Sequence, residues 1–275
     1  MLDFRVDLEK CIGCGLCAAD CPIRIIEMRD RLPVLVPQKE KFCIGCLHCF
    51  AVCPEGAVSI LGHSPEDEIE LTKDSLPAPD QMEALIRGRR SVRSYRDENM
   101  EPELIDELLN MAWQAPTGRN NRDTVFHVID DKDVLAELRE ELLAGIQKLV
   151  DDETLGKAYA GYTKFPSVWK EYNYDALFRS APHLIITSAP TDVPTPMQDA
   201  VIALTTFEMY AQTKSVGTIW NELARGAIVD LVPSTLRRLG IPEDHEVGYV
   251  MGFGLPALKY NRTVSRGKAT VRKIK

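Results

Sequence analysis

The sequence predicts an α+β protein that combines a small metal-binding part with a larger layered domain. All eight cysteines lie in the N-terminal fifth of the chain, in two runs of identical spacing. A segment rich in acids and prolines follows at residues 64–82. From about residue 83, helix-like and strand-like stretches alternate, which is typical of α+β layers. We therefore expect domains at residues 1–63 and 83–275, joined by a linker at 64–82.

The two cysteine runs share the pattern C-x2-C-x2-C-x3-C-P. This spacing is typical of bacterial proteins with two 4Fe-4S clusters, where the fourth cysteine of each run ligates the other cluster. Three thiolates two residues apart can enclose one side of a cluster, and Gly13, Gly15 and Gly45 ease the tight turns. The expected ligand sets are Cys11, Cys14, Cys17 and Cys53 for one cluster, and Cys43, Cys46, Cys49 and Cys21 for the other.

Two other interpretations of the cysteines are weaker. Zinc ribbons also pair C-x-x-C units, but they need no third cysteine and no following proline. Disulfides suit small secreted domains, whereas a chain of 275 residues can bury a sizeable core. Because thiolates and oxygen-labile clusters suit a reducing compartment, we expect a cytoplasmic protein.

Residues 1–63 closely resemble the two-cluster bacterial ferredoxins. The second run begins 32 residues after the first, which suits two related half-units rather than a repeat array. Apolar residues at 25–28 and 32–36 flank the turn residues 29–31, and this pattern predicts a small hairpin.

The composition is that of a soluble globular chain, with 45% apolar and 27% charged residues. No stretch resembles a membrane span or a secretion signal, and the net charge of -8 disfavours nucleic acid as a partner. Charge is unevenly distributed, because residues 64–82 hold six acids and one lysine, whereas residues 256–275 hold seven bases and no acid. The basic segment is either a solvated tail or an arm that wraps a partner subunit and offers a base to a phosphate.

Hydrophobic periodicity predicts the elements of the larger domain. Helices are expected at residues 101–114, 131–150 and 197–213. Strands are expected at residues 124–129, 183–187 and 247–251. At least three strands among more numerous helices argue for an α+β layered domain.

Three short motifs occur in this domain in a fixed order. They are Arg-Arg-Ser-Val-Arg-Ser-Tyr at 89–95, Ala-Pro-Thr-Gly-Arg-Asn at 115–120 and Gly-Thr-Ile-Trp at 217–220. On these motifs, residues 83–275 resemble the nitroreductase superfamily of FMN enzymes. The resemblance implies a central, mostly antiparallel sheet flanked by helices, with FMN at a homodimer interface.

The resemblance also implies which residues contact FMN. Guanidinium groups match the geometry of a phosphate dianion, so the cluster of Arg89, Arg90, Ser91 and Arg93 suits the FMN phosphate, with Arg262 completing the site. A solvated basic helix end is the alternative for this cluster. The turn residues Pro116, Thr117, Gly118 and Asn120 would reach the flavin of the other subunit. Around the third motif, Trp220, Asn221 and Glu222 would lie near the redox ring through their backbone groups.

Seven aromatic residues fall between positions 159 and 178, out of 19 in the chain. One hypothesis is that some of these rings cover the flavin and select flat, electron-poor substrates; core packing is the alternative. The five histidines have no ligand-like spacing.

Together these features predict an oxidoreductase that passes electrons through two 4Fe-4S clusters to FMN, which reduces a nitroaromatic, quinone or activated alkene. The donor is either a ferredoxin-like protein or NAD(P)H. Two alternatives stay open: an electron-transfer adaptor or flavin-based sensor without turnover, and a flavin enzyme for reductive dehalogenation. No separate dinucleotide-binding motif is present in the sequence.

Overall fold

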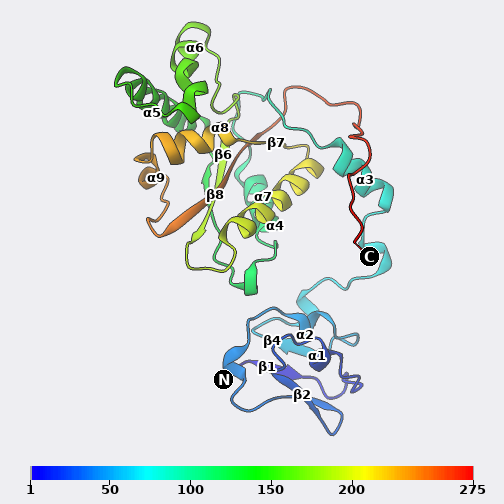
Figure 1. Ribbon diagram of the computed structural model, residues 1–275. Helices are drawn as coiled ribbons and strands as arrows, with labels where there is room; N and C mark the ends of the chain where they lie inside the picture. The colour runs from blue at the N-terminus through cyan, green and yellow to red at the C-terminus, as the bar shows by residue number, and fades with distance from the viewer. Residues whose placement is uncertain (1, 275) are drawn as a thin grey trace. The chain divides into compact units, whose positions relative to one another are not determined.

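The computed structural model describes residues 2–274, which divide into two compact units (Figure 1). The first unit contains the residues up to Pro77 together with Arg119–Asn121. The second contains Ala78–Gly118 and the residues from Arg122 onward. Among the described residues, no helix combines the length and apolarity that a membrane crossing requires.

The first unit is built from two short antiparallel strand pairs. Strand β1 (Phe4–Val6) pairs with β4 (Val58–Ile60), and β2 (Ile26–Arg29) pairs with β3 (Leu32–Leu35). The second pair is the predicted hairpin, and Asp30 and Arg31 at its turn both have positive φ, as a tight two-residue turn requires. This expectation from the sequence is confirmed.

Two one-turn helices complete the first unit, and each carries the third cysteine of a run. They are α1 (Leu16–Ala19) and α2 (His48–Ala51). Short 3-10 helices lie at η1 (Glu40–Phe42), η2 (Pro65–Asp67) and η3 (Lys73–Ser75). Cys17 and Cys49 are buried in one small core with Ile26, Val58 and Ile60. The cysteine runs are therefore part of the packing of this unit.

A four-stranded antiparallel sheet forms the centre of the second unit, in the order β5-β6-β8-β7. The strands are β5 (Val125–Ile129), β6 (His183–Pro190), β7 (Gly217–Trp220) and β8 (His245–Gly254). The main helices are α3 (Pro79–Gly88), α4 (Pro102–Ala112), α5 (Lys132–Asp151), α6 (Phe165–Tyr172) and α7 (Pro196–Thr213). Shorter helical segments are η5 (Lys157–Lys164), α8 (Glu222–Arg225), the π-helix η6 (Gly226–Leu231) and α9 (Thr235–Arg238). The short segment η4 (Gly118–Asn120) begins in this unit, and its last two residues belong to the first. The predicted α+β class and antiparallel sheet are confirmed.

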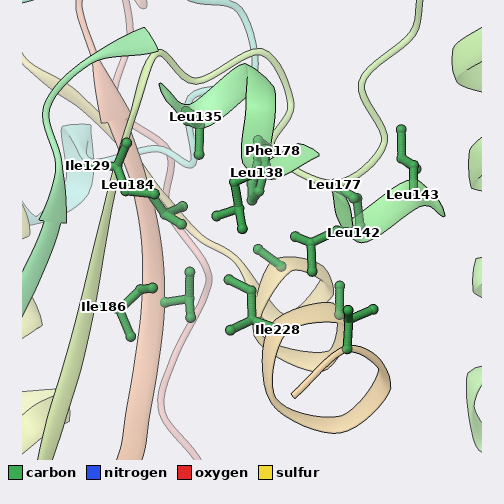
Figure 2. Close-up of a cluster of buried hydrophobic side chains, with 14 of the residues drawn as sticks. Ile129, Leu135, Leu138, Leu142, Leu143, Leu177, Phe178, Leu184, Ile186 and Ile228 are labelled. Atoms are coloured by element: carbon green, nitrogen blue, oxygen red, sulfur yellow. The ribbon is translucent and has the colours of Figure 1, made fainter. Parts of the chain in front are cut away.

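Successive side chains of a strand point to opposite faces of a sheet. In this sheet, each face packs against its own set of helices. On one face, Leu184 and Ile186 of β6 pack with Leu138 of α5 and Ile228 of η6, as Figure 2 shows. On the other face, Ile185 joins a core formed mainly by α4 and α7. Each face buries its own apolar cluster, so β6 is fully buried along most of its length.

Helix α7 approaches the sheet closely where β8 carries a glycine. A Cβ on Gly248 would collide with the side chain of Ala200 on α7. The close approach brings the polar residues of α7 near β7, which runs beside β8. Helix α7 is therefore the element that positions the candidate site of this unit.

Candidate functional site

The first set of four cysteines lies around one cavity. Cys11, Cys14, Cys17 and Cys53 border about 340 Å³ of empty space, with Met28, Pro33 and Val58 among the apolar neighbours. The loop that carries them needs glycine, because a Cβ on Gly13 would lie 2.7 Å from the carbonyl oxygen of Arg31. Three of these cysteines come from the first run and one from the second.

The second set has the same arrangement around a similar cavity. It consists of Cys21, Cys43, Cys46 and Cys49. Gly45 has a φ of 63° in its loop, as Gly13 has 68° in the first. The repeat is imperfect, since Leu47 adopts a left-handed φ of 59° where the first run has Gly15. The structure thus brings together the two crossed sets that the spacing predicts.

One buried thiol in each set has a raised pKa. Burial raises the pKa of Cys17, and neighbouring cysteines act in the same direction. Burial raises the pKa of Cys49 to about 11, again assisted by the other thiols of its set. Among residues 2–274, no three Cys, His, Asp or Glu side chains could share one metal ion. Four thiols spread around a cavity suit a polynuclear group better than a single zinc ion.

The arginine-rich segment at 89–93 runs beside β7 in the second unit. The amide of Val92 donates to the carbonyl oxygen of Thr218 at 2.8 Å, and Ser91 forms a bridge with Thr218. Nη1 of Arg93 donates to the carbonyl oxygen of Ser91 at 3.3 Å. Two of the three predicted motifs are therefore adjacent.

A cavity with about 920 Å³ of empty space, which we name the basic cavity, lies beside this segment. Its bases are Arg90, Lys259 and Arg262, and its lining contains no acid. The other lining residues are Gly88, Val92, Gln212, Ser215, Val216, Gly217, Pro256, Leu258, Tyr260, Asn261 and Thr263. This arrangement suits a phosphate group.

The basic cavity differs from the expected grouping of the arginines. We expected Arg89, Arg90, Ser91 and Arg93 to lie with Arg262. The lining contains Arg90 and Arg262 but none of the other three. Beyond the end of α3, Arg90 and Val92 line the cavity whereas Arg89 and Ser91 do not, so this stretch exposes alternate residues to it, as extended backbone does. Arg89 instead pairs with Glu208 of α7 at 3.0 Å.

The turn that contains Pro116 and Thr117 is held by α7. Both carboxylate oxygens of Asp199 accept from the amide of Gly118, at 3.0 and 3.1 Å, and Asp199 is 3% exposed. Oγ1 of Thr117 accepts from the amide of Arg122 at 3.0 Å. Asn120 has a φ of 56°. It belongs to the first unit, whereas Pro116, Thr117 and Gly118 belong to the second.

Trp220 and the two residues after it have distinct environments. Nε1 of Trp220 donates to Glu208 at 3.0 Å, and its ring lies edge-on to Tyr249. The side chain of Asn221 is buried, because it caps α8 through Ala224 and donates to the carbonyl oxygen of Leu177. The side chain of Glu222 is exposed, with Arg225 3.7 Å away. The Asn221 side chain is therefore engaged inside the fold.

Two family models match this chain. Residues 86–255 match the nitroreductase family, and residues 10–57 match the 4Fe-4S dicluster domain. The chain belongs to the nitroreductase family. It also carries a dicluster domain at its N-terminal end.

Named relatives agree with membership of the nitroreductase family, and a solved structure shares the fold. A protein of Methanothermobacter thermautotrophicus, named provisionally as an NADH dehydrogenase/NAD(P)H nitroreductase, is 26% identical over 62% of this chain and 75% of its own. A 4-nitrobenzoate reductase of Nocardioides is 41% identical over 17% of this chain and 19% of its own. The FMN-bound nitroreductase of Bacteroides fragilis has a TM-score of 0.57 at 22% identity, covering 71% of this chain and all of that one.

The aromatic segment of this nitroreductase-family chain mostly packs into the protein. Tyr162 and Phe178 are buried in the main core, and Tyr159, Phe165 and Trp169 pack against it. Trp169 stacks on the guanidinium of Arg139 at 4.1 Å and donates to Glu140. Only Tyr172 and Tyr174 are exposed among the seven. Five of the seven rings therefore lie in or against the core, as the alternative of core packing predicts.

Sequence reasoning missed three residues that organise the site: Glu208, Asp199 in its anchoring role, and Lys259. An acid within an apolar helix was the available signal for Glu208, whose neighbours Phe207 and Ala211 are fully buried. Such an acid requires a partner. The sequence could not identify that partner, because Arg89 lies 119 residues away.

Proposed function

We propose that this protein is an oxidoreductase that receives electrons one at a time through two 4Fe-4S clusters and passes them to FMN for reduction of a small, electron-poor acceptor. The observation that carries the proposal is the pair of four-thiol cavities in a chain of the nitroreductase family. The short match to a 4-nitrobenzoate reductase supports nitroaromatics as one acceptor class. Quinones and activated alkenes are the others.

The donor chemistry of the two thiol-lined cavities fits iron-sulfur clusters. Cysteine thiolates are the usual cluster ligands, and each cavity offers four. The raised pKa values of Cys17 and Cys49 mean that their thiolate forms need a nearby positive charge, which bound iron supplies. We assign Cys11, Cys14, Cys17 and Cys53 to one cluster and Cys21, Cys43, Cys46 and Cys49 to the other.

The chemistry of the basic cavity fits the phosphate of FMN. Its three bases provide charge-assisted donors, and its lining offers no acid to repel a dianion. When bound, FMN supplies two-electron chemistry, whereas each cluster exchanges one electron.

The residues of this chain would bind and orient the cofactor. Arg90, Lys259 and Arg262 would hold the phosphate, and their charge would favour a reduced, anionic flavin. The turn at Pro116 and Thr117 is fixed through Asp199, so its backbone is pre-positioned for a ligand. Trp220 would border the redox ring, with its indole held by Glu208.

We propose further that FMN lies at a homodimer interface, as the family resemblance implies. Val201 and Ile202 on α7 are 39% and 40% exposed, and such apolar side chains suit a contact with a second copy. Light scattering of the full chain tests this proposal. A dimeric mass is expected, and a stable monomer with bound FMN would contradict it.

The function is tested by purifying the full chain without oxygen and measuring its cofactors and turnover. We expect about eight iron atoms and one FMN per chain. We also expect reduction of at least one member of a panel of nitroaromatics, quinones and activated alkenes, with reduced ferredoxin or NAD(P)H as donor. Absence of both cofactors would overturn the proposal. A chain that holds both cofactors but reduces no acceptor would be an electron-transfer adaptor or sensor.

A further inference from the structure

Two equivalent backbone carbonyls, one in each cysteine run, accept a hydrogen bond from a side chain. The runs are offset by 32 residues, so Ile12 of the first corresponds to Ile44 of the second. The carbonyl oxygen of Ile12 accepts from Nη2 of Arg31 at 3.3 Å. That of Ile44 accepts from Nδ2 of Asn120 at 3.0 Å. The first loop is therefore held by a neighbour in the same half of the repeat, whereas the second is held by a residue 76 positions away.

Asn120 makes a second bond to the loop of the second run. Its Nδ2 also donates to the carbonyl oxygen of Gly45 at 3.0 Å. An amide nitrogen carries two hydrogens, so one side chain can serve both carbonyls. Ile44 and Gly45 lie between Cys43 and Cys46 in the sequence. Asn120 thus fixes the backbone that joins two cysteines of the second set.

The two loops also differ in exposure. Ile12 is 55% exposed and Cys14 is exposed, but their counterparts Ile44 and Cys46 are half-buried. Asn120 contributes to this difference, because its Nδ2 would lie 3.8 Å from a Cβ placed on Gly45. The loop of the second set is therefore covered where the loop of the first set faces solvent.

The chain leads directly from Asn120 to the turn at residues 116–118. Gly118 stands two positions earlier, and its amide is held by the buried carboxylate of Asp199. Asn120 itself has a φ of 56°, a left-handed conformation that asparagine tolerates better than most residues. Only Arg119 separates the two, and each residue has just two soft dihedral angles. A change in the turn therefore alters the position from which Asn120 donates.

We propose that Asn120 is a positioning residue that couples the second cysteine set to the turn at residues 116–118. A flavin bound at the turn fixes Asn120 and so tightens the loop at Ile44 and Gly45. By reciprocity, a filled second set favours the turn conformation that binds flavin. This inference rests on the proposed binding of FMN and of two clusters. The role is additional to the flavin contact that the resemblance implies for Asn120.

The test is amide hydrogen exchange, measured by mass spectrometry on the full chain under anaerobic conditions, with both cofactors and again after removal of FMN. In the wild type, removal of FMN should speed exchange in residues 44–47 about tenfold and leave residues 12–15 unchanged. Asn120→Gly retains the left-handed backbone but deletes the amide. With FMN in excess, it should speed exchange in residues 44–47 about tenfold. Removing FMN from this variant should then add less than about twofold.

Two glycine substitutions at left-handed positions serve as matched controls. Arg119 also has a φ of 56° and an exposed side chain, and Arg119→Gly should change exchange in neither loop. Arg31 has a φ of 65° and is the donor of the first run. Arg31→Gly should speed exchange in residues 12–15 and leave residues 44–47 as they are.

Iron release to a ferrous chelator is a second measurement of the same coupling. Cys11→Ala should keep only the second set filled, and Cys43→Ala only the first. Adding Asn120→Gly should speed release about tenfold in the first background and not in the second. Bound FMN should slow release in the first background alone. If a cysteine variant holds no iron, the exchange experiment decides, because it needs no cysteine substitution.

Equal exchange of residues 44–47 in Asn120→Gly and the wild type would overturn the inference. So would an effect of FMN removal that is the same in both loops, or absent from both. A wild-type chain that holds neither iron nor FMN would overturn the proposed function. A chain that holds both cofactors, but whose second loop does not respond to FMN, would overturn this inference alone.

Discussion

Asp175 and Arg139 form a buried ion pair beside the main core of the second unit. The Asp175 side chain is 2% exposed and accepts from Nη1 of Arg139 at 3.2 Å and from the amides of Phe178 and Ser180. Arg139 is 18% exposed and stacks on Trp169. Loss of one partner from such a pair leaves the other charge buried without compensation.

We therefore expect Asp175→Ala to lower the free energy of unfolding by about 3 kcal/mol or more. Urea denaturation followed by tryptophan fluorescence measures this loss. Glu137→Gln is the control, because Glu137 is 71% exposed and pairs with Arg238 at the surface. That variant should cost less than about 1 kcal/mol, and equal losses for the two variants would contradict this account.

His183 is a buried histidine with a proton on a defined nitrogen. Its Nε2 accepts from the amide of Met100 at 3.0 Å, so the proton of the neutral ring lies on Nδ1. Burial lowers the pKa of His183, and it also lowers the pKa of His127. Both rings are therefore held neutral by the fold.

A lowered pKa in the fold means that the unfolded chain binds the proton more readily. The contribution of these histidines to the free energy of unfolding is therefore complete above about pH 6.5, the pKa of histidine in an unfolded chain. It decreases as the pH falls through that value. We expect the free energy of unfolding to fall from about pH 7.5 to pH 5.5, and His183→Gln to reduce the slope. A slope that the substitution leaves unchanged would show that His183 does not contribute. Urea titrations at each pH measure it.

For single residues, the sequence predicted part of the candidate site and missed the rest. The cysteine sets follow from local spacing, which fixes which thiols can reach one cluster. The partner of Arg89 and the side of the segment that faces the basic cavity depend on tertiary packing, which local spacing does not encode. For the same reason, the role of Lys259 was missed.

Among the elements, the turn at Gly118 depends on close packing with α7. A Cβ at Gly118 would collide with the hydroxyl of Thr195, and the amide of Gly118 donates to Asp199. We expect Gly118→Ala to displace the turn and raise the dissociation constant of FMN about tenfold. Fluorescence titration of FMN measures the effect. Gly161→Ala is the control, because a Cβ there meets nothing within 4 Å. Unchanged affinity of Gly118→Ala would contradict a role for this turn.

Helices α4, α5 and α7 and strand β5 begin and end within two residues of their predicted positions, because each has strong periodicity. Strands β6 and β8 are longer than predicted. Strand β6 continues past its predicted end at residue 187, and Pro190 still pairs with His245 at the last position of that strand. The glycines of β8 obscured its pattern, and the π-helix η6 has no local signal that we recognised.

For the molecule as a whole, the crossed cysteine sets make a specific prediction. Cys53→Ala should destroy the cluster of Cys11, Cys14 and Cys17 and reduce the iron content from about eight to about four atoms. The electron paramagnetic resonance spectrum of the reduced variant should match that of Cys11→Ala. A match to Cys43→Ala would show that each run ligates its own cluster.

The combination of an iron-sulfur part and a flavin domain was predictable from the sequence, because each depends on short motifs. The direction of electron flow depends on potentials and on partners, which motifs do not encode. Electron transfer from the clusters to the flavin is therefore the central claim that requires a direct measurement.

That measurement is the rate at which reduced ferredoxin bleaches the bound flavin under anaerobic conditions, in the wild type and in Cys11→Ala. Wild-type protein should be bleached by reduced ferredoxin, and the variant should lose this reaction while keeping any direct reduction by NAD(P)H. Bleaching of Cys11→Ala by reduced ferredoxin at the wild-type rate would contradict the proposed path through the clusters.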